Sequence, residues 1–80
     1  MAKLDSDQLR QVIERAKDKS QNYVYLVIAQ RRNKRIWKYE VLRAFTTLLE
    51  ASSYQIEAHK HYFNISTKYV LIEECGPYLK

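Results

Sequence analysis

Glycine, proline and cysteine are almost absent from this chain. Its 80 residues include one of each, and the glycine and proline are adjacent at positions 76 and 77. This scarcity excludes a glycine-rich phosphate-binding loop of the usual kind, as well as collagen-like and proline-rich recognition segments. One cysteine cannot form a disulfide framework within the chain. We therefore expect a cytoplasmic protein, or one from another reducing intracellular compartment.

Long apolar runs are also missing. The longest run without a charged residue, residues 20–30, is too short to span a bilayer, and no basic and then apolar signal segment opens the chain. We therefore expect no membrane partner. Hydrophobic residues at 46% and charged residues at 29% are ordinary for a globular protein. The length provides material for one core, so residues 1–80 are expected to form a single small domain, with 75–80 as a loosely packed tail.

The positive charge is concentrated in one stretch. The chain has 14 Lys and Arg against 9 Asp and Glu, which gives a formal net charge of +5. Residues 31–43 contain six basic residues and one acid, Glu40, and so carry +5, whereas the eight basic and eight acidic residues elsewhere cancel. Charge that serves only solubility is not expected to be partitioned in this way. The basic residues of the stretch are Arg31, Arg32, Lys34, Arg35, Lys38 and Arg43.

Hydrophobic periodicity predicts a helix followed by a buried strand. Apolar residues between positions 9 and 16 recur at the spacing of one helix face, which predicts an amphipathic helix over about 6–19. Asp5 as N-cap, with Gln8 reaching back to it, would form a capping box at its start. Residues 23–29 are apolar without polar alternation and rich in β-branched and aromatic side chains. That pattern favours a strand covered on both faces, at the centre of the sheet.

The basic stretch allows two interpretations. In the first, residues 32–35 form a hairpin turn and residues 35–40 a second strand. In the second, Asn33 caps a helix whose apolar stripe begins at Trp37, which would make this tryptophan a core anchor. Both interpretations include a helix over about 40–52.

The C-terminal part is expected to form a hairpin. Residues 54–58 alternate apolar and polar as in a strand with one buried face, and residues 67–74 form a last strand, so residues 54–74 are predicted as antiparallel. The fold class is α+β, with two helices packed on one face of a small, mainly antiparallel sheet of three or four strands in the order α-β-(β)-α-β-β. The order strand, helix, hairpin is similar to that of Alba-like and other small nucleic-acid-binding proteins, a resemblance of topology.

Cations and aromatic residues alternate closely in the basic stretch. Lysine and arginine can neutralise phosphates, and Trp37 and Tyr39 could stack on unpaired bases. We therefore predict a small nucleic-acid-binding protein, DNA-binding or RNA-binding. The alternative is a small regulatory protein, for example one encoded by a virus or mobile element, that docks the same basic loop on an acidic protein surface. In both cases the binding residues are Arg31, Arg32, Lys34, Arg35, Trp37, Lys38, Tyr39 and Arg43.

Tyrosine is abundant, with seven residues in the chain. Five of them fall on or beside the expected strands. They could form an exposed aromatic sheet face that stacks on bases, or lie half-buried with their hydroxyls in water. These residues are Tyr23, Tyr25, Tyr54, Tyr62 and Tyr69.

Two further patterns could carry chemistry. Glu57, His59 and His61 would share one face of a strand at a spacing that suits metal ligands. Cys75 with either histidine could form a nucleophile and base pair. No cysteine pair, helical His–Glu motif or glycine-rich oxyanion loop supports either pattern, so we expect no metal, no cofactor and no enzymatic activity.

We also expect a homodimer. A chain of this length buries only about 60% of its unfolded surface. Two helices on one face would leave the other face of an apolar central strand uncovered. Self-association through that face, or through an edge strand, would complete the core.

Overall fold

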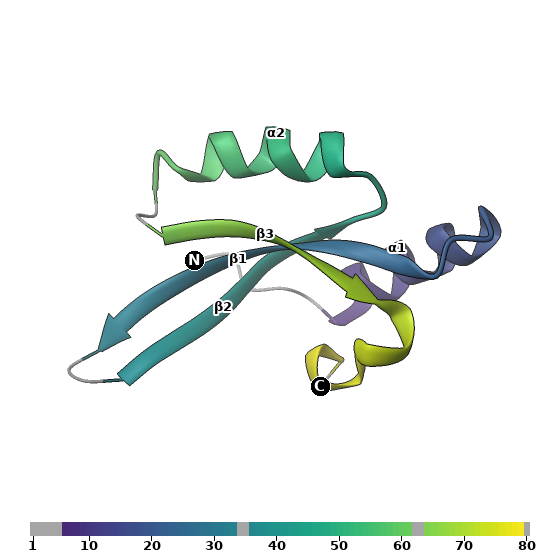
Figure 1. Cartoon of the computed structure of the whole chain (residues 1–80), viewed down its shortest axis with the longest axis horizontal. Coiled ribbons are helices and arrows are strands. Elements are labelled where there is room, and N and C mark those ends of the chain that lie inside the picture. The colour runs from purple at the N-terminus through teal and green to yellow at the C-terminus, as the bar shows by residue number, and fades with distance from the viewer. Residues whose placement is uncertain (1–5, 34–35, 62–63, 80) are drawn as a thin grey trace.

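A computed structural model describes residues 6–33, 36–61 and 64–79, with the side chains of 31–33 and 36–39 outside that description. The three strands form one antiparallel sheet in the order β2-β1-β3 (Figure 1). The predicted α+β class, with two helices and a small antiparallel sheet, is therefore confirmed. The elements are α1 (Ser6–Asp18), β1 (Tyr23–Asn33), β2 (Ile36–Phe45), α2 (Leu48–Ala58) and β3 (Asn64–Leu71), followed by the 3₁₀ turns η1 (Ile72–Glu74) and η2 (Gly76–Tyr78).

β1 is the central strand, as its unbroken apolar run predicted. It pairs with β2 on one side and β3 on the other, so that Tyr25 lies opposite both Phe45 and Tyr69. Successive side chains of a strand point to opposite faces, and both faces of β1 are buried. Residues 24 and 26–29 of this strand are each at most 5% exposed to solvent.

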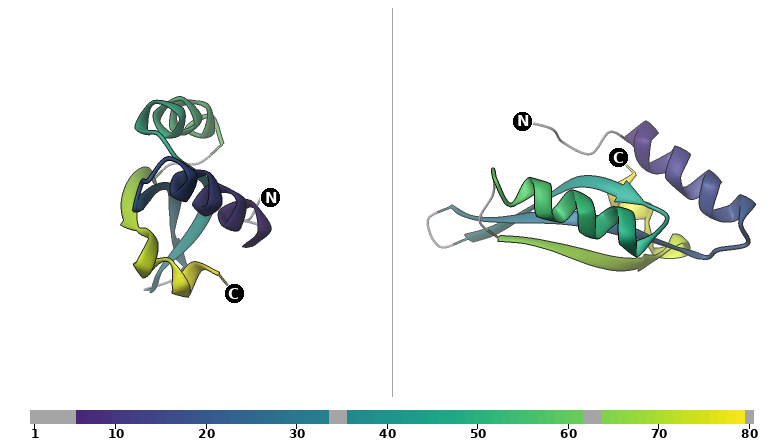
Figure 2. Two further views of the ribbon diagram at one scale, coloured as in Figure 1. Left: turned by 90° about the vertical axis from the view of Figure 1, so that its right-hand side faces the viewer. Right: turned by 90° about the horizontal axis from the view of Figure 1, so that it is seen from above.

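The two helices cover opposite faces of the sheet, so the prediction that both pack on one face is wrong. α1 packs on the face that carries Val24, Leu26 and Ile28. α2 packs through two alanines on the face that carries Val27 and Ala29. Both views of Figure 2 show the helices apart from each other. Residues 23–29 of β1 are all apolar, so this strand has two faces to bury, and one helix can cover only one of them. The second face, which we expected to drive dimerisation, is thus covered within the chain.

The hairpin interpretation of the basic stretch is confirmed. β2 begins at Ile36 and pairs back on β1, with Asn33 opposite Ile36. The alternative, in which Asn33 caps a helix that begins near Trp37, is wrong. The turn residues 34 and 35 themselves lie outside the described residues.

The second helix begins later than predicted. Residues 40–45 belong to β2, and α2 starts only after Thr47, whose hydroxyl accepts a hydrogen bond from the Glu50 N–H at 3.3 Å. The expected helix over 40–52 is therefore confirmed only for residues 48–52, and the expected strand over 54–58 is wrong. The apolar positions of a short segment fit the period of a helix as well as that of a strand, and here pairing with β1 makes residues 40–45 a strand.

The last strand is also displaced. β3 covers Asn64–Leu71 and continues into η1, whereas the prediction was a strand over 67–74. Its partner is β1, from Tyr23 opposite Leu71 to Gln30 opposite Asn64. The hairpin expected over 54–74 is therefore wrong.

α1 confirms the predicted N-terminal helix, but Gln8 does not act as a cap. Its side-chain amide donates to the Ala44 carbonyl at 2.9 Å and accepts from the Ala44 N–H at 3.1 Å. Asp5, the expected N-cap, lies outside the described residues. The Gln8 amide thus satisfies backbone groups on the open edge of β2, where no further strand pairs, and ties α1 to the sheet.

The C-terminal segment returns to the core. Cys75 is fully buried in the cluster that joins α1 to the sheet. Tyr78 and Leu79 lie half-buried against the same cluster. Cys75 is therefore tightly packed, in contrast to the loose packing expected for residues 75–80.

α1 ends in a left-handed residue that is not glycine. Ser20 has a φ of 58°. Its N–H bonds to the Lys17 carbonyl, and the Gln21 N–H bonds to the Ala16 carbonyl, which is the Schellman pattern. A side chain in this region costs about 1–2 kcal/mol, and glycine avoids that cost.

We expect Ser20→Gly to stabilise the protein. Part of the gain is lost to the greater freedom of glycine in the unfolded chain, by about 0.4–1 kcal/mol. The net stabilisation should be up to about 1 kcal/mol, which raises Tm by roughly 4–8 °C. Thermal unfolding followed by circular dichroism measures it. The matched control is Ser53→Gly, inside α2, which should lower Tm. A lower Tm for Ser20→Gly would contradict the argument.

Candidate nucleic-acid interface

The β1–β2 hairpin extends beyond the third strand. Among the described residues, pairing between β1 and β3 ends at Gln30 opposite Asn64. Pairing between β1 and β2 continues to Asn33 opposite Ile36. Residues 31–33 and 36–38 therefore form a two-stranded ribbon that projects past β3 and α2 (Figure 1). Sequence positions 31–38 are hereafter called the basic arm.

The net charge of the chain lies entirely within this arm. Residues 31–38 contain five basic residues and no acid, so the arm carries +5. The remaining nine basic and nine acidic residues of the chain cancel. The stretch defined from sequence, residues 31–43, has the same charge of +5 as the shorter basic arm, residues 31–38, because the charges of Arg43 and Glu40 cancel.

The register brings like charges together. Arg31 pairs with Lys38, and Arg32 pairs with Trp37. Like charges directly opposite each other on a sheet are destabilising. Two basic residues thus occupy directly paired backbone positions of the ribbon.

The other predicted binding residues are only partly described. Trp37, Lys38 and Tyr39 belong to β2, with Tyr39 opposite Gln30, but their side chains lie outside the described residues. Lys34 and Arg35 lie wholly outside them. Of the predicted residues, the structure thus brings together five as backbone positions of one ribbon: Arg31, Arg32, Trp37, Lys38 and Tyr39.

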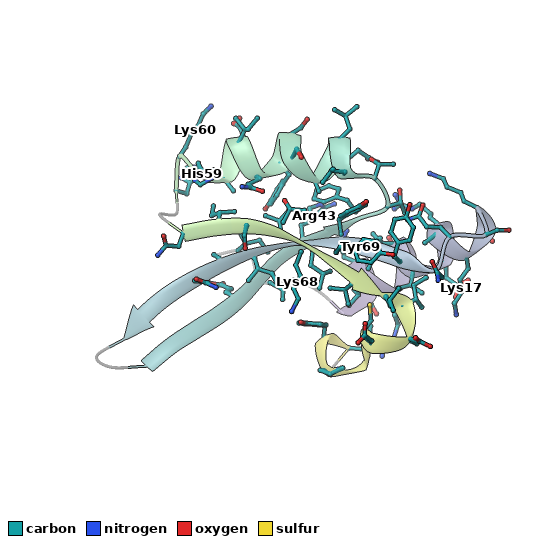
Figure 3. The ribbon with its side chains drawn as sticks, in the orientation of Figure 1. Lys17, Arg43, His59, Lys60, Lys68 and Tyr69 are labelled. Carbon is teal, nitrogen blue, oxygen red and sulfur yellow. The ribbon has the colours of Figure 1, made fainter. Side chains whose placement is uncertain are left out.

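Arg43 is separated from the arm. The β1–β2 register shifts between Val27 and Ile28, so Arg43 pairs with Val27 while Val41 already pairs with Ile28. Leu42 is the extra residue of this bulge. The exposed Arg43 side chain lies near α1 and the start of α2, and it lines a small hollow with Arg15 and Glu50 (Figure 3). The structure does not join Arg43 to the arm.

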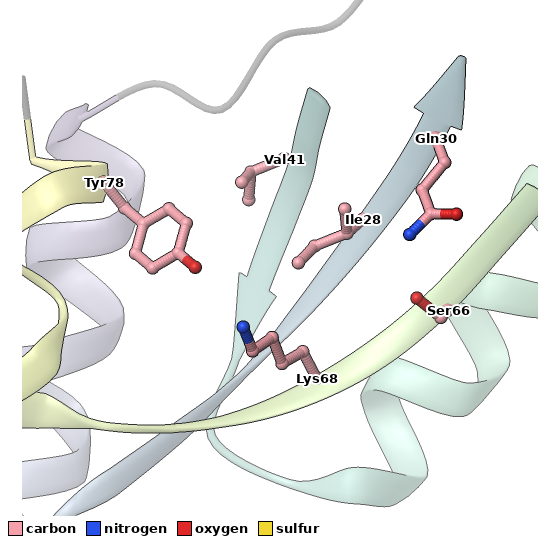
Figure 4. Close-up of a pocket in the computed structure, with 6 residues that line it drawn as sticks. All are labelled: Ile28, Gln30, Val41, Ser66, Lys68 and Tyr78. Atoms are coloured by element: carbon pink, nitrogen blue, oxygen red, sulfur yellow. The ribbon is translucent and has the colours of Figure 1, made fainter. Parts of the chain in front are cut away.

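A hollow of about 420 Å³ lies at the base of the arm. It occupies the part of the α1-side sheet face that α1 does not cover, between the strands and η2 (Figure 4). Sequence reasoning missed this site, because pairing of β1 with β3 and the return of the C-terminal segment assemble it from residues far apart in the chain. Its lining residues are Ile28, Gln30, Val41, Ser66, Lys68 and Tyr78.

Three of the predicted tyrosines form a cluster away from the arm. The ring centroids of Tyr23, Tyr25 and Tyr69 are 4.8–5.9 Å apart. Tyr69 is 53% exposed, whereas Tyr23 and Tyr25 are half-buried. Tyr54 instead belongs to α2 and packs on Phe45, and the predicted residue 62 lies outside the described part. The cluster borders the beginning of β1, at the opposite end of that strand from the arm.

The proposed strand with Glu57, His59 and His61 does not exist. Glu57 lies in the last turn of α2 and its carboxylate pairs with Lys60 at 3.2 Å, while both histidines follow the helix. Within residues 6–33, 36–61 and 64–79, no group of three His, Cys, Asp or Glu side chains is placed to hold a metal ion.

Cys75 is not placed as a nucleophile. Its thiol is buried and donates to the Leu71 carbonyl at 3.5 Å. Burial raises the pKa of this thiol, and the nearby negative charge of Glu74 raises it further. Reactive cysteines have a lowered pKa and are accessible, so this site favours the protonated, inert form.

Comparison with family models, with curated proteins and with solved structures found no match to this chain. In the part of the chain that the structure describes, no helix is long and apolar enough to cross a membrane.

Proposed function

We propose that this protein binds nucleic acid through the basic arm. One observation carries the proposal: the entire net charge lies within sequence positions 31–38, and the described residues of that segment, 31–33 and 36–38, form the part of the β1–β2 ribbon that projects past β3. Projection favours binding, because cations on a free ribbon can approach phosphates without obstruction by the body of the protein. A two-stranded ribbon also has the width that the DNA major groove admits.

The arm residues take two roles in this proposal. Arg31, Arg32, Lys34, Arg35 and Lys38 neutralise phosphates and release their counterions. Phosphates between Arg31 and Lys38 would turn a destabilising like-charge pair into a binding site.

The aromatic positions 37 and 39 supply a second, sequence-tolerant contribution. Both are in the same strand as Lys38, so bases could stack there while cations hold the backbone. Arg43 has no part in this contact, because it lies beyond the bulge and next to α2.

Titration of fluorescently labelled single-stranded and duplex oligonucleotides at several salt concentrations tests the proposal. Binding that weakens steeply as salt increases is the expected result, because each phosphate contact releases condensed cations. Failure to bind DNA or RNA even at low salt would contradict it. In that case, capture of an acidic protein from nuclease-treated lysate would favour the regulatory alternative.

We expect Trp37→Ala to weaken single-strand binding without unfolding the protein. Position 37 lies opposite Arg32, past the last pairing with β3, and is therefore remote from the three-stranded core. Loss of one stacked base should cost about 1–3 kcal/mol, a decrease in affinity of roughly 5- to 150-fold. The salt slope should not change. Anisotropy titrations and melting curves measure the two effects, and a Tm lowered by tens of degrees would show that Trp37 is a core residue instead.

We also propose that the chain forms a homodimer, through the outer face of α2. Leu49 and Ile56 are 79% and 69% exposed and lie two turns apart, so they share one stripe of the helix with Leu48 at its edge. Antiparallel pairing of two α2 helices about a twofold axis would bury this stripe against itself. Sedimentation equilibrium should give twice the monomer mass of 9.6 kDa, and Ile56→Lys should give the monomer. A wild-type monomer at high micromolar concentration would contradict this proposal.

A further inference from the structure

We propose that the hollow at the base of the basic arm binds one unpaired nucleotide of the nucleic acid that the arm holds. This inference rests on the proposed function and adds a substrate class to it, because it makes single-stranded segments the preferred partner. The hollow is lined by side chains from β1, β2, β3 and η2 (Figure 4).

The floor of the hollow suits the face of a base. Ile28 and Val41 project from neighbouring strands at a paired position, and together they form an apolar surface. The Tyr78 ring stands beside this surface, with its hydroxyl directed toward the sheet (Figure 4). Aromatic rings stack on bases of any sequence. The volume of about 420 Å³ lies within the range of small-molecule sites, about 300–1,000 Å³.

The rim carries groups that match the edge of a base and a phosphate. The Gln30 amide offers both a donor and an acceptor, and the Ser66 hydroxyl can serve as either. The Lys68 side chain extends from β3 toward Tyr78 (Figure 4), and its ammonium group can pair with the phosphate of the same nucleotide. Binding sites typically combine an apolar surface with a few such convergent polar groups.

These polar groups remain available for a ligand. Among the described residues, none forms a hydrogen bond or an ion pair with the side chains of Gln30, Ser66, Lys68 or Tyr78. By contrast, the hydroxyl of Thr67, which is on the other face of β3, donates a hydrogen bond of 2.5 Å to the side-chain oxygen of Gln55 in α2. The polar side chains that line the hollow thus have no hydrogen-bond partner among the described residues, whereas Thr67 and Gln55 bond to each other and tie α2 to β3.

The hollow is continuous with the arm. Gln30 directly precedes Arg31 in β1, and Val41 follows the arm in β2. A strand of nucleic acid whose phosphates lie along the arm would therefore pass the mouth of the hollow. A base within a duplex is stacked on both of its faces and paired along one edge. Only a base that is free to turn out of the strand can therefore enter the hollow.

The test compares a hollow-filling variant on three probes. These are a single-stranded oligonucleotide, the corresponding duplex, and an abasic strand that keeps the sugar and phosphates. Ser66→Leu should lower affinity for the single strand by about 5- to 150-fold, the effect of one lost stacking contact. It should leave the affinities for the duplex and the abasic strand unchanged, because the arm is intact. Position 66 is exposed in an edge strand, so the fold should tolerate leucine there; a melting curve checks this.

A second variant separates the phosphate contact from the base contact. Lys68→Gln should reduce the salt slope on single strands by about 0.7, the value for one phosphate contact. The matched control is Lys17→Gln, which removes the same charge at the far end of the molecule and should change nothing (Figure 3). In the wild type, the methyl NMR signals of Ile28 and Val41 should shift when the single strand is added. Those of Leu49 and Ile56, on α2, should not shift.

The outcomes distinguish the two proposals. If the wild type binds single strands but both hollow variants bind as tightly as it does, and the Ile28 and Val41 signals do not move, the hollow is not a nucleotide site and the arm alone binds. Equal losses on duplex and single strand for Ser66→Leu would also overturn this inference. If the wild type binds none of the probes, the proposed function itself is wrong.

Discussion

Replacing Arg31, Arg32, Lys34 and Arg35 together by glutamine is expected to abolish nucleic-acid binding near physiological salt. On duplex DNA, log K falls with log salt at a slope of about −0.9 for each neutralised phosphate, and on single strands at about −0.7. Loss of four contacts should therefore flatten the slope by about three to four on duplex and by about three on single strands. Fluorescence anisotropy between 50 mM and 200 mM salt measures both the affinity and the slope.

The matched control removes the same charge from another surface. Arg10, Arg15, Lys17 and Lys19 are exposed on or directly after α1. Their replacement by glutamine also lowers the formal charge by four, yet it should preserve most of the binding and most of the slope. Equal binding by the two quadruple variants would show that the arm is only solvated surface. The arm variant should keep its Tm, because the arm lies outside the three-stranded part of the sheet.

Leu26→Ala is expected to have the largest effect on stability. Leu26 is fully buried in the central strand, opposite Ala44 and Lys68, within the cluster that α1 covers. Truncation of a buried leucine costs about 2–5 kcal/mol, because apolar contacts are lost and a cavity remains. At about 0.05–0.15 kcal/mol per residue, the whole domain is stable by only roughly 4–12 kcal/mol. We therefore expect Tm to fall by about 10 °C or more, and thermal unfolding followed by circular dichroism measures it.

The same substitution on the surface is the control. Leu49 is 79% exposed on α2, and alanine is the better helix former. At low micromolar concentration, Leu49→Ala should change stability by no more than about 0.5 kcal/mol. A small effect of Leu26→Ala, comparable to that of Leu49→Ala, would contradict the central position of β1 in the core.

Local patterns in the sequence determined the first part of the fold. The apolar stripe of residues 9–16 predicted a helix over 6–19, and the seven-residue apolar run at 23–29 favoured a strand by its length and its β-branched and aromatic content; both predictions are confirmed. A fully apolar strand also implied a central position, because only neighbours on both sides and layers on both faces can bury it. The partition of charge was likewise readable without a structure, since it depends only on which residues are consecutive.

Tertiary structure decided the second part. Residues 40–45 and 54–58 are short, and their apolar positions fit a helix or a strand, so local propensity could not distinguish the two. With a single glycine in the chain, turn signals that would have marked the boundaries are also scarce. Pairing with β1 selected the strand for 40–45, and the uncovered second face of β1 selected a helix for 54–58.

The candidate site, too, has one feature that the sequence determined and others that only the tertiary structure decided. The sequence by itself determined that the positive charge of this protein lies in one short segment. Only the tertiary structure decided that residues 31–33 and 36–38 form a projecting ribbon, because among the described residues β3 pairs with β1 no further than Gln30. The hollow at its base depends wholly on tertiary contacts: Ile28, Lys68 and Tyr78 are far apart in the chain, and they meet because β3 pairs beside β1 and the C-terminal turns fold back against the sheet.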